Sequence, residues 1–154
     1  MRKSSKRNNK NSQRVIKRTP AQTIKQATFP VLSLFIFTFI FEWLAHGKLL
    51  THLYQETREL WRPENEIGEY FSFKVMSQFF YILVFFFIAS KLYKGKDLTE
   101  GAYYGFYIGL FSGIVQFSAY ALIPISLTLA AIWLSLALIQ GTGMGIVLTL
   151  ARRK

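Results

Sequence analysis

Residues 101–151 read GAYYGFYIGLFSGIVQFSAYALIPISLTLAAIWLSLALIQGTGMGIVLTLA and contain no Asp, Glu, Lys, Arg or His. A helix on the surface of a soluble domain needs a polar face toward water, so this composition excludes an ordinary soluble globular fold. A membrane-spanning helix takes about 20 apolar residues, so the stretch is long enough for two spans. Pro124 lies near its centre and favours a break there. We therefore predict a hairpin of two membrane helices, at about 101–123 and 125–150.

Two further apolar segments precede this hairpin, at about 29–47 and 70–93. The four segments together predict an all-α fold, an integral membrane bundle of four transmembrane helices within residues 29–151. Between the first two segments, apolar residues recur at helical spacing from Leu49 to Trp61. This pattern predicts a short amphipathic helix that lies in the membrane interface. Residues 1–28 are predicted to form a disordered basic arm, and residues 152–154 a basic tail.

The charges of the chain are sorted along the sequence. The formal net charge is +11 on a chain that is 51% hydrophobic, and fifteen of the 19 Lys and Arg residues lie in the arm, in the segment 91–96 and in the tail. By the positive-inside rule, both termini are cytoplasmic, and we expect a multi-pass protein of the bacterial inner membrane. A cleaved signal peptide over residues 31–41 would leave three spans, but the long charged arm and the bulky Glu42-Trp43 disfavour it.

The basic arm allows two interpretations, membrane-lipid binding and nucleic-acid binding. Nine Lys and Arg residues without an acid in residues 1–25 attract anionic lipid headgroups and also enforce the topology. A nucleic-acid-binding segment more often has interleaved aromatic residues or belongs to a folded module, and the first 28 residues contain no aromatic residue. We therefore predict that the partners are the bilayer and its anionic lipids, and no nucleic acid.

Glycines recur with a spacing of four in the third predicted span and are matched in the fourth. Four residues turn a helix by about 400°, so each series lies on nearly one face and lets another helix approach closely. The partner is either the neighbouring span or, in a homo-oligomer or larger membrane complex, another chain. The predicted packing residues are Gly101, Gly105, Gly109 and Gly113, with Gly141 and Gly145.

Charged residues interrupt the first two spans at a similar depth. Glu42 precedes the outer end of the first span and Lys74 follows the outer end of the second, so we predict an ion pair between them. His46 and Gln78 follow these residues by four positions and share their helix faces. Gln116 lies near the outer end of the third span.

These polar residues near the outer ends of the spans have one functional and two structural interpretations. It predicts a polar pocket, open to the outside, for a small polar ligand, an ion or a lipid headgroup. Alternatively, the network is fully satisfied and fixes the register of the helices, or Lys74 alone extends toward the interface. Gln140 is expected to lie deeper and to be separate from this network.

A metal site at Glu42, His46 and His52 is disfavoured. His52 follows His46 by six residues, which places it about 240° around a continuous helix, and only a break at Gly47 would bring the three together. The chain has no Cys, so cysteine-based zinc sites and cysteine nucleophiles are excluded. No cofactor and no catalytic residue are predicted.

A motif in the first half resembles a family of small uncharacterised bacterial integral membrane proteins. Glu42-x3-His46-Gly47 is followed by Tyr54 and by Trp61-Arg62-Pro63, and later by Glu100-Gly101 and Pro124-Ile125. Members more often have Asp at the position of Glu42 and lack the basic arm. The resemblance covers about residues 30–150, supports the four-helix topology and adds Trp61 and Arg62 to the outer pocket.

Two classes of function follow. The first is a non-catalytic membrane protein, either a bundle with an outward-facing polar pocket or an accessory subunit of a membrane complex. The second is a small membrane enzyme that acts on a lipid-borne substrate, with or without a metal. The absence of a convincing catalytic set favours the first class.

Overall fold

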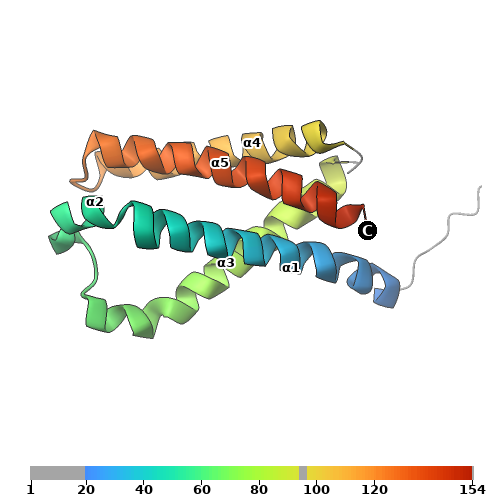
Figure 1. Cartoon of the computed structure of the whole chain (residues 1–154), viewed down its shortest axis with the longest axis horizontal. Helices are drawn as coiled ribbons and strands as arrows, with labels where there is room; N and C mark the ends of the chain where they lie inside the picture. The colour runs from blue at the N-terminus through green and yellow to red at the C-terminus, as the bar shows by residue number, and fades with distance from the viewer. Residues whose placement is uncertain (1–19, 94–96, 154) are drawn as a thin grey trace, which may run out of the picture.

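A computed structural model describes residues 20–93 and 97–153, and every regular element in these residues is a helix, which confirms the all-α class (Figure 1). Three short irregular helices join or extend the main ones: a π-helical turn at Ala45–Leu49 and 3-10 turns at Arg58–Leu60 and Ser118–Ala121. The main helices are α1 (Pro20–Leu44), α2 (Thr51–Glu56), α3 (Glu64–Leu92), α4 (Leu98–Phe117) and α5 (Leu127–Arg152).

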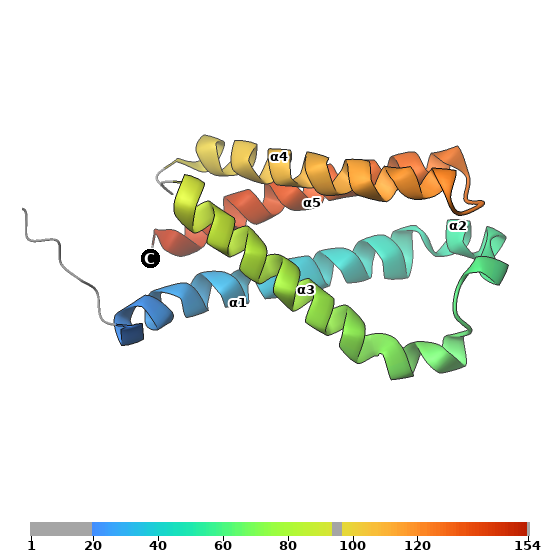
Figure 2. The same cartoon turned by 180° about the vertical axis from the view of Figure 1, so that it is seen from behind.

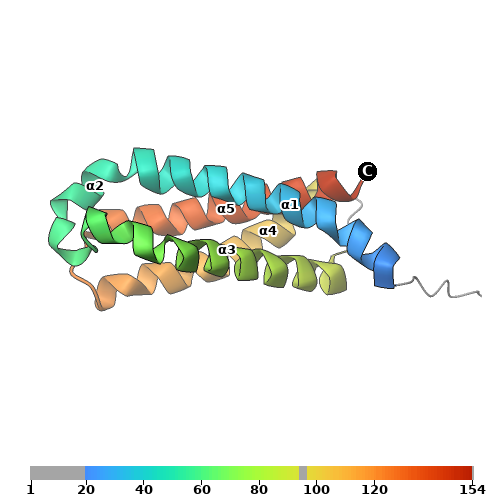
Figure 3. The same ribbon diagram turned by 90° about the horizontal axis from the view of Figure 1, so that it is seen from below.

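Three helical segments are long and apolar enough to cross a membrane: Gln26–Leu49, Asn65–Leu92 and Leu127–Arg152. The chain is therefore compatible with a membrane protein. α4 is not among the three, because its glycines and tyrosines lower its mean hydropathy, although its 20 residues extend over about 30 Å. The four long helices run along the long axis of the molecule, and both ends of the described chain lie at the end opposite to α2 (Figure 3).

Three helices begin earlier than predicted: α4 starts at Leu98 rather than near residue 101, and α1 and α3 differ by more. α1 starts at Pro20, so residues 20–28, which we predicted to be disordered, are helical. Proline suits the first turn of a helix, and the segment that follows, AQTIKQAT, contains no helix breaker. Residues 1–19 of the predicted arm lie outside the described residues. α3 starts at Glu64 rather than near residue 70, directly after Pro63.

The glycines of α4 face α5. Gly101, Gly105, Gly109 and Gly113 are all buried. A Cβ atom on Gly109 would lie 2.5 Å from the carbonyl oxygen of Ala137, and one on Gly105 would overlap the carbonyl group of Gly141. The two backbones are therefore in direct contact, which no larger residue would allow.

Ser126 caps the start of α5 by accepting a hydrogen bond from the Leu129 amide.

α3 crosses α1 and diverges from the α4–α5 hairpin toward its N-terminal end (Figure 2). Its C-terminal half is anchored, since Ile82 and Phe85 belong to the core with Met144 of α5. The Tyr104 hydroxyl of α4 donates a 2.6 Å hydrogen bond to the Phe85 carbonyl oxygen. The N-terminal half of α3 has no comparable packing among the described residues, and its outward-facing aromatic side chains are exposed.

α2 folds over the start of α5. Leu50, just before α2, is buried with Ile125 and Leu129, and Tyr54 and Trp61 pack against this cluster. Leu50, Leu53, Tyr54 and Trp61 therefore pack against Ile125 and the start of α5, whereas Leu49 and Leu60 are exposed. The helix itself has 6 residues and does not extend over the whole loop.

Candidate functional site

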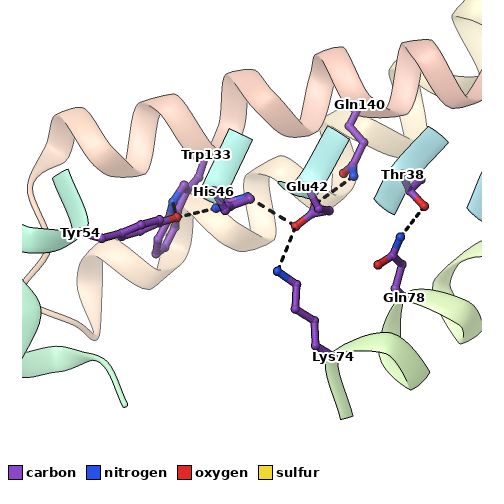
Figure 4. Close-up of polar contacts among 8 residues, drawn as sticks. All are labelled: Thr38, Glu42, His46, Tyr54, Lys74, Gln78, Trp133 and Gln140. Carbon is purple, nitrogen blue, oxygen red and sulfur yellow. Dashed lines mark hydrogen bonds and ion pairs between the residues drawn. The ribbon is translucent and has the colours of Figure 1, made fainter. Parts of the chain in front are cut away.

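Three polar residues at a spacing of four share one face of α1 and of the π-helical turn that extends it: Thr38 and Glu42 on α1 and His46 in the turn. This spacing aligns their side chains along the helix, toward α3 and α5. Figure 4 shows that Lys74 and Gln78 of α3 approach them from one side and Gln140 of α5 from another. The sequence-predicted residues Glu42, His46, Lys74 and Gln78 are thus brought together in one site.

The Glu42 carboxylate is the centre of this site. It accepts a 2.9 Å hydrogen bond from the Gln140 side-chain amide. The His46 Nε2 atom lies 3.6 Å and the Lys74 Nζ atom 4.0 Å from its other oxygen. Glu42 therefore has one close donor and two more distant basic groups.

Lys74 is held only weakly. Its side chain is 57% exposed, against 27% for Glu42, and the 4.0 Å separation is long for a direct charge-assisted hydrogen bond. Within the described part of the chain, the Lys74 ammonium makes no hydrogen bond, so its N–H donors are open to another group.

His46 connects the site to α2. Its Nδ1 atom lies 2.5 Å from the Tyr54 hydroxyl, which accepts a 2.9 Å hydrogen bond from the Trp133 indole. The Tyr54 hydroxyl can donate its own proton to Nδ1 while it accepts from Trp133, and the tautomer that receives this bond carries its proton on Nε2, facing Glu42. Burial raises the pKa of the Tyr54 phenol, the hydrogen bond from Trp133 opposes this shift, and the charge of Glu42 adds to it.

Thr38 forms a second contact between α1 and α3. Its hydroxyl accepts a 2.6 Å hydrogen bond from Gln78 Nε2 and donates to the carbonyl oxygen of Leu34, at 3.0 Å. Sequence reasoning missed Thr38, because a threonine in an apolar helix commonly bonds its own backbone. Its position four residues before Glu42 is the pattern that identifies it.

Gln140 corrects the prediction, since it was expected to lie apart from Glu42 and instead bonds it. The predicted depths were counted from helix ends at residues 47 and 125. The π-helical turn extends the first helix to Leu49, and α5 begins at Leu127. Each two-residue shift brings the two side chains closer by about 3 Å along the membrane normal.

Two cavities meet at the contacts between α1 and α3. The larger one has a volume of ≈ 440 Å³, and Gln116 lies in its wall together with residues of α1, α3, α4 and α5. The smaller one has a volume of ≈ 220 Å³ and lies between α1, its π-helical turn and α3. Glu42, Lys74 and Gln78 line both cavities.

Trp61 and Arg62 lie outside the walls of both cavities. Trp61 packs edge-on against Tyr54, with ring centroids 5.2 Å apart, and so supports the site indirectly. The Arg62 guanidinium lies 3.7 Å from the centre of the Tyr70 ring. It is also within 3.9 Å of Glu66, so its contacts are local to the start of α3.

His52 does not join Glu42 and His46. Its side chain is 83% exposed and faces Glu56, at 3.5 Å. In residues 20–93 and 97–153, no group of three or more His, Asp or Glu side chains is arranged to hold a metal ion. A metal site at Glu42, His46 and His52 therefore has no geometric support among the described residues.

The resemblance to a family of small bacterial membrane proteins stays a prediction. It rests on the motif from Glu42 to Pro63 and on two dipeptides later in the chain. Comparison of the chain with protein-family models, curated proteins and solved structures finds no match.

Proposed function

We propose that the chain is a multi-pass inner-membrane protein with four spans and cytoplasmic termini. Three helices already have the length and composition of spans. α4 extends along α5 through its glycine face and has one charged residue, Glu100, near its start. Successive long helices run in opposite directions between the two ends of the molecule (Figures 1 and 3). This arrangement supports an even number of membrane crossings. The basic arm then faces anionic lipid on the cytoplasmic side.

Single cysteines test this topology without interference, because the chain has none of its own. We expect an impermeant thiol reagent to label Glu59→Cys and Leu122→Cys in intact spheroplasts, and Lys10→Cys and Lys96→Cys only after lysis. Leu122 is 86% exposed, so lack of access would not explain a failure to label. Labelling of residues 96 and 122 from the same side would mean that α4 does not cross, and would overturn four spans.

We further propose that the protein acts through its polar cavity, as a non-catalytic binder of a small polar ligand, an ion or a lipid headgroup. One observation carries this proposal: a lysine and a glutamate lie in the wall of an accessible cavity lined by four helices, with neutral polar side chains around them. Charged groups inside membrane segments are costly and usually serve a function or a tightly paired structure.

The geometry favours function over a purely structural network. A structural ion pair in a membrane gains from short, shielded contacts, because each charge loses its hydration. Here the Lys74 side chain is more than half exposed and its nitrogen stays 4.0 Å from the carboxylate. The side-chain amide of Gln116, in the same cavity wall, makes no hydrogen bond with any described residue. The cavity thus has unused donors and acceptors.

Glu42→Gln tests the binding role, with Glu69→Gln as the control because Glu69 is exposed on α3. Native mass spectrometry of each purified protein measures which small molecules or lipids remain bound. We expect wild type and Glu69→Gln to retain the same species and Glu42→Gln to lose it while keeping its helical circular dichroism. Loss of folding in Glu42→Gln, or identical bound species in all three, would make the network structural.

A second candidate function is a small membrane enzyme that acts on a lipid-borne substrate. The observation that favours it is the series of contacts from Tyr54 to His46 and from His46 to Glu42. A carboxylate facing a histidine is a common arrangement in acid–base catalysis. Lipid extracts of cells that overproduce wild type or His46→Gln distinguish the two functions. A new or depleted lipid species that depends on His46 would support the enzyme.

A third arrangement is an accessory subunit of a larger membrane complex or a homo-oligomer. The apolar outward faces of α3 and α4 are compatible with lipid or with another chain, and Phe73 and Phe111 are exposed on them. Crosslinking in intact membranes would reveal such a partner.

A further inference from the structure

Two polar bridges join α1 to α3 and separate the two cavities. Thr38 bonds Gln78, and Glu42 faces Lys74 one helical turn further out. The smaller cavity has a largely aromatic and apolar wall made by Phe39, Trp43, Phe71 and Val75, with His46 and Gly47 and the three polar residues that it shares with the larger cavity. The bridges therefore lie where an aromatic groove between two helices meets a larger cavity that has more polar side chains in its wall.

The two charged groups, Glu42 and Lys74, differ in how closely their partners approach. Glu42 has Gln140 as a close donor and His46 nearby, whereas Lys74 has only the distant carboxylate among the described residues. An ammonium group at this depth favours an additional anionic oxygen, such as a phosphate oxygen, that accepts its free N–H bonds.

The charge pattern also selects against simple ions. A lone anion at Lys74 would lie next to the Glu42 carboxylate, and a lone cation at Glu42 would lie next to Lys74, because the two groups are 4.0 Å apart. A ligand with both a negative and a positive group places each against its opposite and adds no net charge to the membrane interior.

We propose that the site binds the phosphoethanolamine headgroup of a phospholipid, with the phosphate at Lys74 and the primary ammonium at Glu42. This inference rests on the proposed binding function of the cavity. The headgroup lies between α1 and α3 at the two bridges, and the glycerol and acyl chains lie along the groove of Phe39, Trp43 and Phe71. A primary ammonium donates hydrogen bonds to a carboxylate, which a quaternary choline group cannot do.

The full chain in detergent micelles provides the test, with phosphatidylethanolamine, phosphatidylcholine and phosphatidylglycerol of identical acyl chains as probes. Native mass spectrometry measures the occupancy of each lipid. We expect phosphatidylethanolamine to bind at least about tenfold more tightly than phosphatidylcholine, since one charge-assisted hydrogen bond accounts for that ratio. Equal binding of these two lipids, or preference of the wild type for phosphatidylglycerol, would overturn the headgroup assignment and leave a binding cavity of another specificity.

Charge variants make the test site-specific. Lys74→Gln should lose most of the phosphatidylethanolamine binding, Lys74→Arg should keep it, and the control Lys91→Gln on the same helix should match wild type. Glu42→Gln leaves the site net positive and should shift preference toward phosphatidylglycerol. If Lys74→Gln, folded by circular dichroism, binds every lipid like wild type, both the headgroup assignment and the proposed binding cavity are wrong.

Soluble phosphoethanolamine separates the two sources of the headgroup. We expect it to compete with the lipid only weakly, because it has no acyl chains for the groove between α1 and α3. Competition at the same concentration as the lipid would identify a water-soluble ligand and overturn the lipid source.

Discussion

The side-chain amide of Gln140 on α5 donates a 2.9 Å hydrogen bond to the carboxylate of Glu42 on α1. The same carboxylate faces Lys74 on α3, so one acidic side chain links three of the long helices. This position makes Glu42 the residue on which both the packing of α1 and the charge of the cavity depend. Its contacts and the helix packing around it lead to four predictions.

Gln140→Leu removes the closest donor of Glu42 and should lower the free energy of unfolding by about 1–3 kcal/mol, because the carboxylate oxygen that accepts from Gln140 loses this hydrogen bond in a partly buried position. Unfolding in mixed dodecyl maltoside and SDS micelles, followed by circular dichroism, measures it. Gln116→Leu is the control, because Gln116 lies in the same cavity wall and its side-chain amide has no hydrogen bond to a described residue. The double variant Glu42→Gln/Gln140→Leu completes the cycle. If its loss of unfolding free energy equals the sum of the losses of the two single variants, the two side chains are not coupled.

Gly109→Ala should destabilise the α4–α5 hairpin by about 1–3 kcal/mol, because the new Cβ atom would lie 2.5 Å from the Ala137 carbonyl oxygen and would force the helices apart. Gly68→Ala, on α3, has nothing within 4 Å and should leave stability unchanged or raise it through higher helix propensity. The same unfolding measurement compares both variants. A Gly109→Ala protein as stable as Gly68→Ala would contradict backbone contact between α4 and α5.

Tyr54→Phe should lower stability by about 1–2 kcal/mol at neutral pH, since the Trp133 indole loses its acceptor and His46 loses its hydrogen-bond partner. Tyr120→Phe, at an exposed tyrosine near the same end of the molecule, is the matched control. Trp133 fluorescence, isolated by replacing Trp43 and Trp61 with Phe in both backgrounds, should shift only in the Tyr54 variant. Equal shifts for both tyrosines would place Tyr54 outside the site.

The stability of the wild type should fall faster than that of Tyr54→Phe as the pH rises above about 10, the ordinary pKa of tyrosine. Burial raises the Tyr54 pKa in the folded state, so above the unfolded pKa the folded state binds more protons than the unfolded state. The free energy of unfolding therefore decreases with pH in that range, and Tyr54 contributes nothing to its pH dependence at lower pH. Parallel curves for the two proteins from pH 8 to 11 would show that Tyr54 is unperturbed.

The sequence predicted the helical class and the approximate helices because uncharged stretches of spanning length have few other stable structures. It also placed Glu42 and Lys74 at a similar depth, since depth follows from the rise per residue once the helix ends are assumed. Its errors come from those ends. Residues 20–28 are helical although they have no apolar periodicity, and the π-helical turn after Leu44 extends the first helix to Leu49.

The site was less accessible to sequence reasoning than the fold. Gln140 and Thr38 contact Glu42 and Gln78 through tertiary packing, which depends on how α5 and α3 rotate about their axes. No local pattern determines that rotation. The segment from Leu49 to Trp61 is predicted to lie in the membrane interface, but α2 packs against α5 and places the Tyr54 hydroxyl beside His46.

The contact between α4 and α5 also bears on how the protein is made. α4 has too many glycines and tyrosines to count among the strongly apolar segments, and its glycine face is complementary to α5 along most of its length. In the four-span topology that we propose, α4 would be a poor substrate for insertion by itself. We therefore expect α4 to insert into the bilayer together with α5, with their glycine contact already formed.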